Sequence, residues 1–94
     1  MNFDMKIEMK KFGDILTSRP AGKEAYLSAR AYILPKESNE EIVLDFDGVK
    51  VLAPSWGDEF ISNIMKDYPG KVSFEHTENL SVQATLAILK KSSL

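Results

Sequence analysis

Cysteine is absent from this chain of 94 residues, so disulfides, thiolate catalysis and cysteine-bound metals are excluded. Histidine occurs once, as His76, and a zinc site would therefore need carboxylates for most of its ligands, which is uncommon. No apolar run approaches the roughly 20 residues of a membrane-spanning helix. A glycine-rich phosphate loop is missing, and no nucleophile and base stand in a recognisable catalytic pattern. We therefore expect a protein that is not an enzyme and has no cofactor or metal.

The charge of the chain is mixed and nearly balanced, with 12 Lys and Arg against 14 Asp and Glu and a net charge of -2. Proteins that bind DNA or RNA use clustered Lys and Arg to neutralise phosphates, and no such block occurs, so we expect no nucleic-acid partner. The first residues, MNFDMKIEMKK, lack the apolar core and small-residue cleavage site of a signal peptide. We expect a soluble cytoplasmic protein with no membrane partner, folded as one domain over residues 1–94.

Hydrophobic periodicity predicts strands that alternate with helices. Residues 3–9 alternate apolar and polar side chains, which is typical of a strand with one buried face. Residues 42–46 form a nearly continuous apolar run, which indicates a central strand, and residues 71–75 alternate again. Residues 12–17 could hold a further short strand. The predicted fold is an α/β sandwich with a small mixed, or mostly parallel, sheet of about four strands and three helices.

Asp47 and Gly48 follow the central strand and leave two interpretations open. Between the apolar segments IVLDF and VKVLA, this Asp-Gly pair has the pattern of a two-residue hairpin turn. Pro54 and the helical pattern behind it argue that the second segment does not continue as a long strand. We favour a strand, a turn and an extended approach to the next helix.

Capping residues mark the first predicted helix. Ser18 is a good N-cap, Pro20 fits the first turn, and Pro35 ends the helix after about residue 34. Gly22 lies inside this helix, where glycine costs about 1 kcal/mol, and we expect it to allow the close approach of another backbone.

Two more helices are predicted in the second half of the chain. The first begins at Ser55, with Asp58 three residues later in a capping-box-like spacing, and YPGK at residues 68–71 marks its end. The last helix follows a cap at Asn79 or Thr77. The order of elements is therefore strand, helix, strand, helix, strand, helix.

With this order in place, the central segment resembles a known family. The stretch IVLDFDGVKVLAPSWGDEF is similar to the STAS domain, the fold of sulphate transporters and anti-sigma factor antagonists. It resembles still more closely the STAS-like domain family of unknown function, in which an apolar strand ends in Leu-Asp-Phe and is followed by Gly-Val, an extended stretch and a serine-containing helix start. SRPAG, at residues 18–22, is similar to that family's first helix start. The resemblance extends from about Phe12 onward and implies a STAS-like sandwich.

The resemblance implies a non-enzymatic regulatory module of the anti-sigma factor antagonist kind. Such antagonists dock on a partner, a histidine-kinase-like ATPase that acts as the anti-sigma factor. Phosphorylation of a serine at the start of the second long helix blocks docking, and a helix N-terminus tolerates a phosphate because its N–H groups are free. Antagonists usually carry Asp-Ser-Ser-Gly at this point. Here Ala53, Pro54, Ser55 and Trp56 stand there, so only the second serine is retained.

Five residues at this helix start are therefore candidates for partner binding or phosphorylation: Pro54, Ser55, Trp56, Asp58 and Glu59. Ser55 has two compatible interpretations, a helix cap and a hydroxyl regulated by phosphate or ligand. Trp56 is either a core residue or an interface anchor, since tryptophan is enriched among interface hot spots. Asp58 and Glu59 are adjacent and do not face each other on a helix, which favours first-turn stabilisation over a catalytic pair.

Three further polar residues have alternative roles. Arg19 is a candidate ligand for an anion, and its other interpretation is a surface ion pair. Asp45 is more typical of a turn partner at the strand end than of a base, and His76 is expected to be an exposed loop residue.

The alternative function for the domain is a small-ligand or nucleotide sensor that uses the same helix N-terminus together with Arg19.

Overall fold

Strands and helices alternate along the chain in the computed structural model, which describes residues 5–37 and 39–92. The strands are β1 (Met5–Glu8), β2 (Ile15–Leu16), β3 (Ile42–Asp45), β4 (Val51–Leu52) and β5 (Val72–Glu75). The helices are α1 (Arg19–Tyr32), α2 (Pro54–Asp67) and α3 (Leu80–Ser92), with a short 3₁₀ helix, η1, over Met9–Phe12. The predicted helices and strands are present, including the short strand expected within residues 12–17. Phe3 of the first predicted strand lies outside the described residues.

The strands form two separate parallel sheets. The mostly parallel alternative is therefore confirmed, and the prediction of a single sheet of about four strands is wrong. β3 lies between β1 and β5 in the three-stranded sheet, and β2 pairs with β4 in the other. Parallel pairing follows because α1 lies between β1 and β3 and α2 between β3 and β5, and such helical crossovers return the chain in the same direction. The Asp47-Gly48 turn makes no hairpin. After the turn, the chain moves away from β3, and β4 pairs with β2 just before α2 begins. This confirms the prediction that an extended segment connects the turn with α2.

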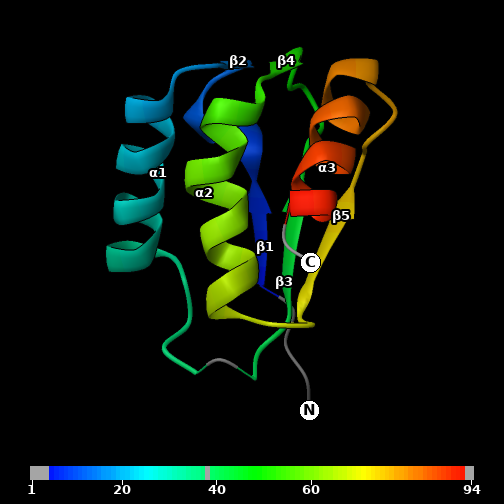
Figure 1. Cartoon of the computed structure of the whole chain (residues 1–94). Helices are drawn as coiled ribbons and strands as arrows, with labels where there is room; N and C mark the ends of the chain where they lie inside the picture. Colours follow the sequence, from blue (N-terminus) through cyan, green and yellow to red (C-terminus); the bar gives the residue numbers. More distant parts are fainter. Residues whose placement is uncertain (1–4, 38, 93–94) are drawn as a thin grey trace.

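The three α-helices lie on one side of the three-stranded sheet (Figure 1). Because side chains alternate along a strand, every second row of the sheet points toward the helices. These inner rows are Met5, Ile42 and Val72, followed by Ile7, Leu44 and Phe74. The alternate rows lie on the opposite face, which no helix covers within the described part of the chain. Its last row, at the carboxyl end of the strands, holds Glu8, Asp45 and Glu75.

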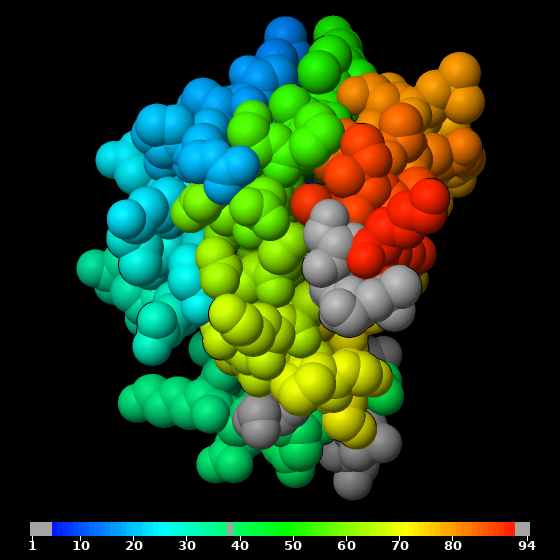
Figure 2. Space-filling model, viewed as in Figure 1, coloured from blue at the N-terminus to red at the C-terminus, as the bar shows by residue number. Residues whose placement is uncertain are grey.

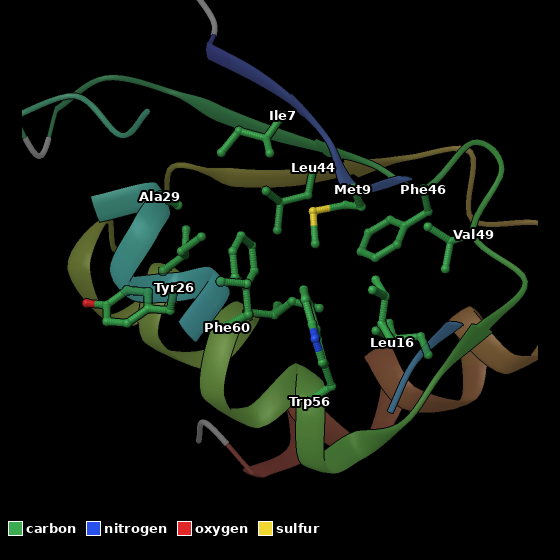
Figure 3. Close-up of a cluster of buried hydrophobic side chains, with 14 of the residues drawn as sticks. Ile7, Met9, Leu16, Tyr26, Ala29, Leu44, Phe46, Val49, Trp56 and Phe60 are labelled. Atoms are coloured by element: carbon green, nitrogen blue, oxygen red, sulfur yellow. The ribbon is translucent and has the colours of Figure 1, made fainter. Parts of the chain in front are cut away.

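Aromatic side chains fill the space between the sheet and α2 (Figure 3). Trp56 is only 2% exposed, and its ring stacks on that of Phe60 with the centroids 5.0 Å apart. Phe12 packs against both rings at centroid distances of 6.1 and 5.0 Å. Gly22 lies where α1 touches α2, and a Cβ atom added there would be 2.5 Å from the backbone oxygen of Trp56. The close backbone approach predicted for Gly22 is therefore confirmed.

Side chains cap two of the helices as the sequence predicts. Ser18 Oγ accepts a hydrogen bond of 3.2 Å from the N–H of Ala21 at the start of α1. Asn79 Oδ1 accepts from the N–H groups of Ser81 and Val82 at 2.7 and 3.2 Å, which selects Asn79 over Thr77 as the cap of α3. Both caps pair N–H groups that the helix itself leaves without partners.

Candidate functional site at the start of helix α2

α1 and α2 begin side by side at the same end of the molecule (Figure 1). The N-cap of α2 is Ala53, whose side chain makes no capping hydrogen bond, and Pro54 is the first helical residue. The predicted cap at Ser55, with Asp58 as its capping-box partner, is therefore wrong. Proline is well suited to the first helical position because its φ angle is preset and its missing N–H would have no partner there. Ser55 consequently lies inside the first turn.

The Ser55 hydroxyl connects α2 with the segment that leads into α1. Its Oγ donates a hydrogen bond of 2.7 Å to the backbone oxygen of Thr17, the residue before the N-cap of α1. The side chain is partly exposed. A group added to this oxygen would remove the donated hydrogen bond and would reach solvent at the junction of the two helices.

Arg19 joins the same two helices a second time. Its Nη1 atom lies 2.9 Å from Oδ2 of Asp58 and 2.7 Å from Oε2 of Glu59. The hydrogen bonds to Asp58 and then to Glu59 raise the pKa of the Arg19 guanidinium. The ion-pair interpretation of Arg19 therefore agrees with the structure, and an added anion would compete with two carboxylates for this side chain. Asp58 and Glu59 are both directed to one cation, which is not the arrangement of a general acid and base.

Figure 2 shows the face of the molecule on which the three helices meet. Three of the five candidates from the helix start line a shallow hollow there. Trp56 is turned into the core and does not contribute to this surface. Pro54 and Asp58 are exposed, while Ser55 and Glu59 are partly buried. The hollow has a volume of about 550 Å³, and its lining residues are Arg19, Pro54, Ser55, Asp58, Ile88 and Leu89. The structure thus brings together Arg19 and three of the five candidates from the helix start.

A second polar group lies on the uncovered face of the sheet, at the carboxyl end of its strands. We call it the strand-end cluster, and it consists of Lys6, Asp45, Glu75 and His76. Asp45 is 5% exposed and accepts a hydrogen bond of 3.0 Å from the N–H of Asp47, which confirms its predicted role in the turn. The His76 ring is half exposed, as expected, but its Nδ1 atom lies 2.7 Å from Oδ1 of Asp45. Sequence analysis missed this pair.

Electrostatic interactions within the strand-end cluster shift two pKa values in opposite directions. Burial acts to raise the pKa of Asp45, but the hydrogen bonds from Asp47 and His76 and the charges of His76 and Lys6 outweigh it, so this pKa is lowered. The hydrogen bond to Asp45, and then the charge of that carboxylate, raise the pKa of His76. Both shifts favour the charged forms, and Asp45 therefore carries a negative charge despite its burial.

Comparison with known proteins identifies the family. The model of the family described as a STAS-like domain of unknown function matches residues 30–81, which is more than half of the chain. The chain belongs to this family. No curated protein and no solved structure matches it. In the part of the chain that the structure describes, no helix is both long enough and apolar enough to cross a membrane.

The matched span divides the candidate residues of this STAS-like domain. It runs from the end of α1 through β3, β4, α2 and β5 into the first residues of α3. The start of α2 lies within it, as do Asp45, Glu75 and His76. Arg19 lies outside it, so the ion pairs between Arg19 and α2 join a matched segment to an unmatched one.

Proposed function

We propose that this STAS-like domain is a non-enzymatic regulatory module that docks on a protein partner through the start of α2. The observation that carries the proposal is the convergence of Arg19, Pro54, Ser55 and Asp58 around one hollow. Family membership supports it, because the anti-sigma factor antagonists that this family resembles dock through the corresponding helix start. The proposed partner is a histidine-kinase-like ATPase that acts as an anti-sigma factor.

The surface around the hollow has the composition and rigidity that a docking site needs. Protein interfaces combine a few apolar contacts with a polar rim, and here Pro54 and Ile88 lie beside charged groups. The Ser55–Thr17 hydrogen bond and the Arg19 ion pairs hold the first turns of α1 and α2 in one arrangement. A surface that is ordered before binding loses less conformational entropy when a partner arrives.

Phosphorylation of Ser55 would change the charge of this surface. A phosphate carries about two negative charges at neutral pH and cannot donate the hydrogen bond that the hydroxyl gives to Thr17. On a helix, Ser55 faces the residues three and four positions later, which are Asp58 and Glu59. The phosphate would repel both carboxylates and compete with them for Arg19. We propose that this rearrangement weakens docking.

The experiment begins with the purified domain as bait and mass spectrometry of the proteins it captures. The captured ATPase is then purified and titrated against the wild-type domain and the variant Asp58→Lys. We expect the variant to bind at least about tenfold more weakly, because a charge reversal inside a docking surface opposes association. Stability should change little, since exposed ion pairs contribute at most about 1 kcal/mol. Circular dichroism will show whether the fold is intact.

A charge-matched control locates the effect on the surface. Glu37→Lys makes the same change in charge in the loop after α1, at the opposite end of the molecule, and should leave affinity unchanged. Equal losses in both variants would mean that overall charge, not the start of α2, governs binding. Ser55→Asp should weaken docking with the fold intact, and unchanged affinity would remove Ser55 from the switch.

The capture experiment, together with melting curves of the domain in the presence of nucleotides, also tests the alternative function of a small-ligand or nucleotide sensor. The two carboxylates already paired with Arg19 disfavour an anionic ligand there. If no ATPase is captured and nucleotides raise the melting temperature of the domain, the docking proposal fails and the sensor replaces it. If an ATPase is captured and nucleotides have no effect, the docking proposal is supported.

A further inference from the structure

The strand-end cluster forms a second site, separate from the start of α2 and independent of the docking proposal. Three of its residues offer metal-ligand atoms: a ring nitrogen of His76 and one carboxylate oxygen each of Asp45 and Glu75. These atoms all lie within 4.8 Å of one another. We propose that Asp45, Glu75 and His76 bind a divalent transition-metal ion of the Zn²⁺ class.

The fold brings the three ligands together from two neighbouring strands. Asp45 ends the central strand β3, and Glu75, its register partner, ends β5. His76 follows Glu75 with a φ angle of 55°, an uncommon conformation for a residue other than glycine, which lets its ring return over the end of β3. The carboxyl ends of parallel strands are also where open α/β sheets place their ligands.

The donor atoms suit a Zn²⁺-class ion. Imidazole nitrogen and carboxylate oxygen both bind zinc at about 2.0–2.2 Å, so the ligand atoms of a tetrahedral site lie about 3.4 Å apart. Because the ligand atoms of the cluster lie within 4.8 Å of one another, no pair of them needs to approach by more than about 1.4 Å. The side chains of Glu75 and His76 are 48% and 50% exposed and have room to adjust, whereas Asp45 is anchored by Asp47.

A cation already occupies the position between the two carboxylates. The Lys6 ammonium lies 3.5 Å from Oδ2 of Asp45 and 3.2 Å from Oε1 of Glu75. A buried carboxylate such as Asp45 requires a compensating positive charge, and Lys6 supplies it from the edge strand β1. A divalent ion in the same position would supply that charge and more. The Lys6 side chain is half exposed, so its ammonium can turn into solvent when the ion binds.

Space for the remaining ligands exists beside Asp45. A hollow of about 320 Å³ adjoins it, lined by Glu8, Lys10, Lys11, Asp45 and Asp47. Zinc sites with three protein ligands complete their coordination with water. The uncovered face of the sheet leaves this side of the cluster open to solvent, so water reaches the ion directly.

The test measures metal binding by the full 94-residue chain, purified without an affinity tag. Zn²⁺ is titrated by calorimetry, and Co²⁺ is followed by its visible absorption, which reports the coordination geometry. We expect one ion per chain and weaker binding of Mg²⁺, which prefers all-oxygen sites. His76→Asn and Glu75→Gln should each lower Zn²⁺ affinity at least about tenfold, a loss typical of damaged metal sites. Asparagine is chosen at residue 76 because it tolerates a positive φ angle.

Two further variants separate this site from general binding of cations. Glu78→Gln removes a nearby carboxylate outside the ligand set and should leave Zn²⁺ affinity unchanged. Lys6→Gln removes the competing ammonium and should tighten binding, and weaker binding in this variant would contradict a metal position between Asp45 and Glu75. The proposal is overturned if the wild-type chain binds no Zn²⁺, or if His76→Asn and Glu75→Gln bind it as tightly as the wild type.

Discussion

The substitution Gly22→Ala sets two effects of opposite sign against each other where α1 touches α2. Alanine is about 1 kcal/mol more favourable than glycine inside a helix, so propensity alone predicts a more stable protein. The structure opposes this gain, because the added Cβ would lie 2.5 Å from the backbone oxygen of Trp56 and 3.0 Å from its Cα. These are backbone atoms, which cannot rotate away as the end of a side chain can.

The magnitude follows from the size of the required shift. Ordinary contacts of a Cβ atom begin at about 3.4 Å, so the helices must separate locally by nearly 1 Å. Overpacking of this kind costs about 1–3 kcal/mol, and a backbone clash belongs at the upper end of that range. Subtracting the gain of about 1 kcal/mol in propensity leaves a net loss of about 2 kcal/mol. For a domain of this size, the melting temperature should fall by about 8–16 °C.

Urea unfolding followed by circular dichroism measures this loss, and two matched variants calibrate it. Ser28→Ala, at an exposed position of α1, reports propensity alone and should be neutral or slightly stabilising. Gly57→Ala places its Cβ 2.8 Å from the terminal Cδ1 of Leu89, a side-chain atom, and should cost less than Gly22→Ala. If Gly22→Ala proves as stable as wild type or more so, the close packing of α1 on Trp56 is refuted.

Three more outcomes are expected from the same structure. Trp56→Ala should lower the free energy of unfolding by about 3–5 kcal/mol in urea titrations, because the ring is almost fully buried, and a loss below about 1 kcal/mol would contradict that burial. Arg19→Ala should leave the free energy of unfolding almost unchanged in the same assay despite its two ion pairs, because they lie at the surface, and a large loss would mean that they are not screened by solvent. The raised pKa of His76 predicts stability that is fully present below the unfolded value of about 6.5 and is lost as pH rises through the folded value. Melting curves in chelator-containing buffer should show this slope in the wild type and lack it in His76→Asn. A slope that persists in His76→Asn would mean that His76 is not its source.

The main elements of the fold could be predicted from the sequence because each is long enough to repeat a pattern. Strands β1, β3 and β5 show alternating or continuous apolar residues, and the caps at Ser18 and Asn79 mark their helices directly. The division into two sheets could not be predicted in this way. β2 and β4 have two residues each, too few to show any period. Their pairing depends on the direction that the chain takes after η1 and after the turn at Gly48.

The wrong cap of α2 arose because two neighbouring residues compete for one position. Ser55 is a good cap by type, but Pro54 takes the first helical position and moves the cap to Ala53. Trp56 could belong to the surface or the core by composition, and only the packing of Phe12 and Phe60 decides between them. Local propensity describes each residue separately and cannot rank two adjacent residues that suit the same place.

The pairing of Asp45 with His76 was missed for a different reason, which is that it depends on the order of the strands in the sheet. Parallel strands in register bring their carboxyl ends to one edge of the sheet, so polar residues that end β3 and follow β5 must lie close together. That reasoning requires β3 and β5 to be neighbours, and the strand order β1-β3-β5 supplies this information only after the fold is known. A known strand order could therefore predict such a cluster where residue patterns alone do not.

Because Ser55 is not the N-cap of α2, its phosphorylation would have an effect that was not expected from the sequence. A capping hydroxyl would accept a hydrogen bond from its own helix, and a phosphate could take over that role without disturbing α1. The hydroxyl of Ser55 instead donates to Thr17, immediately before the cap of α1. A phosphate oxygen cannot donate, so modification must break this contact and leave the Thr17 carbonyl to find another donor. Any effect of phosphate on Ser55 should therefore extend to the first turn of α1, and amide exchange at Ala21 and Gly22 in Ser55→Asp is the measurement that would detect it.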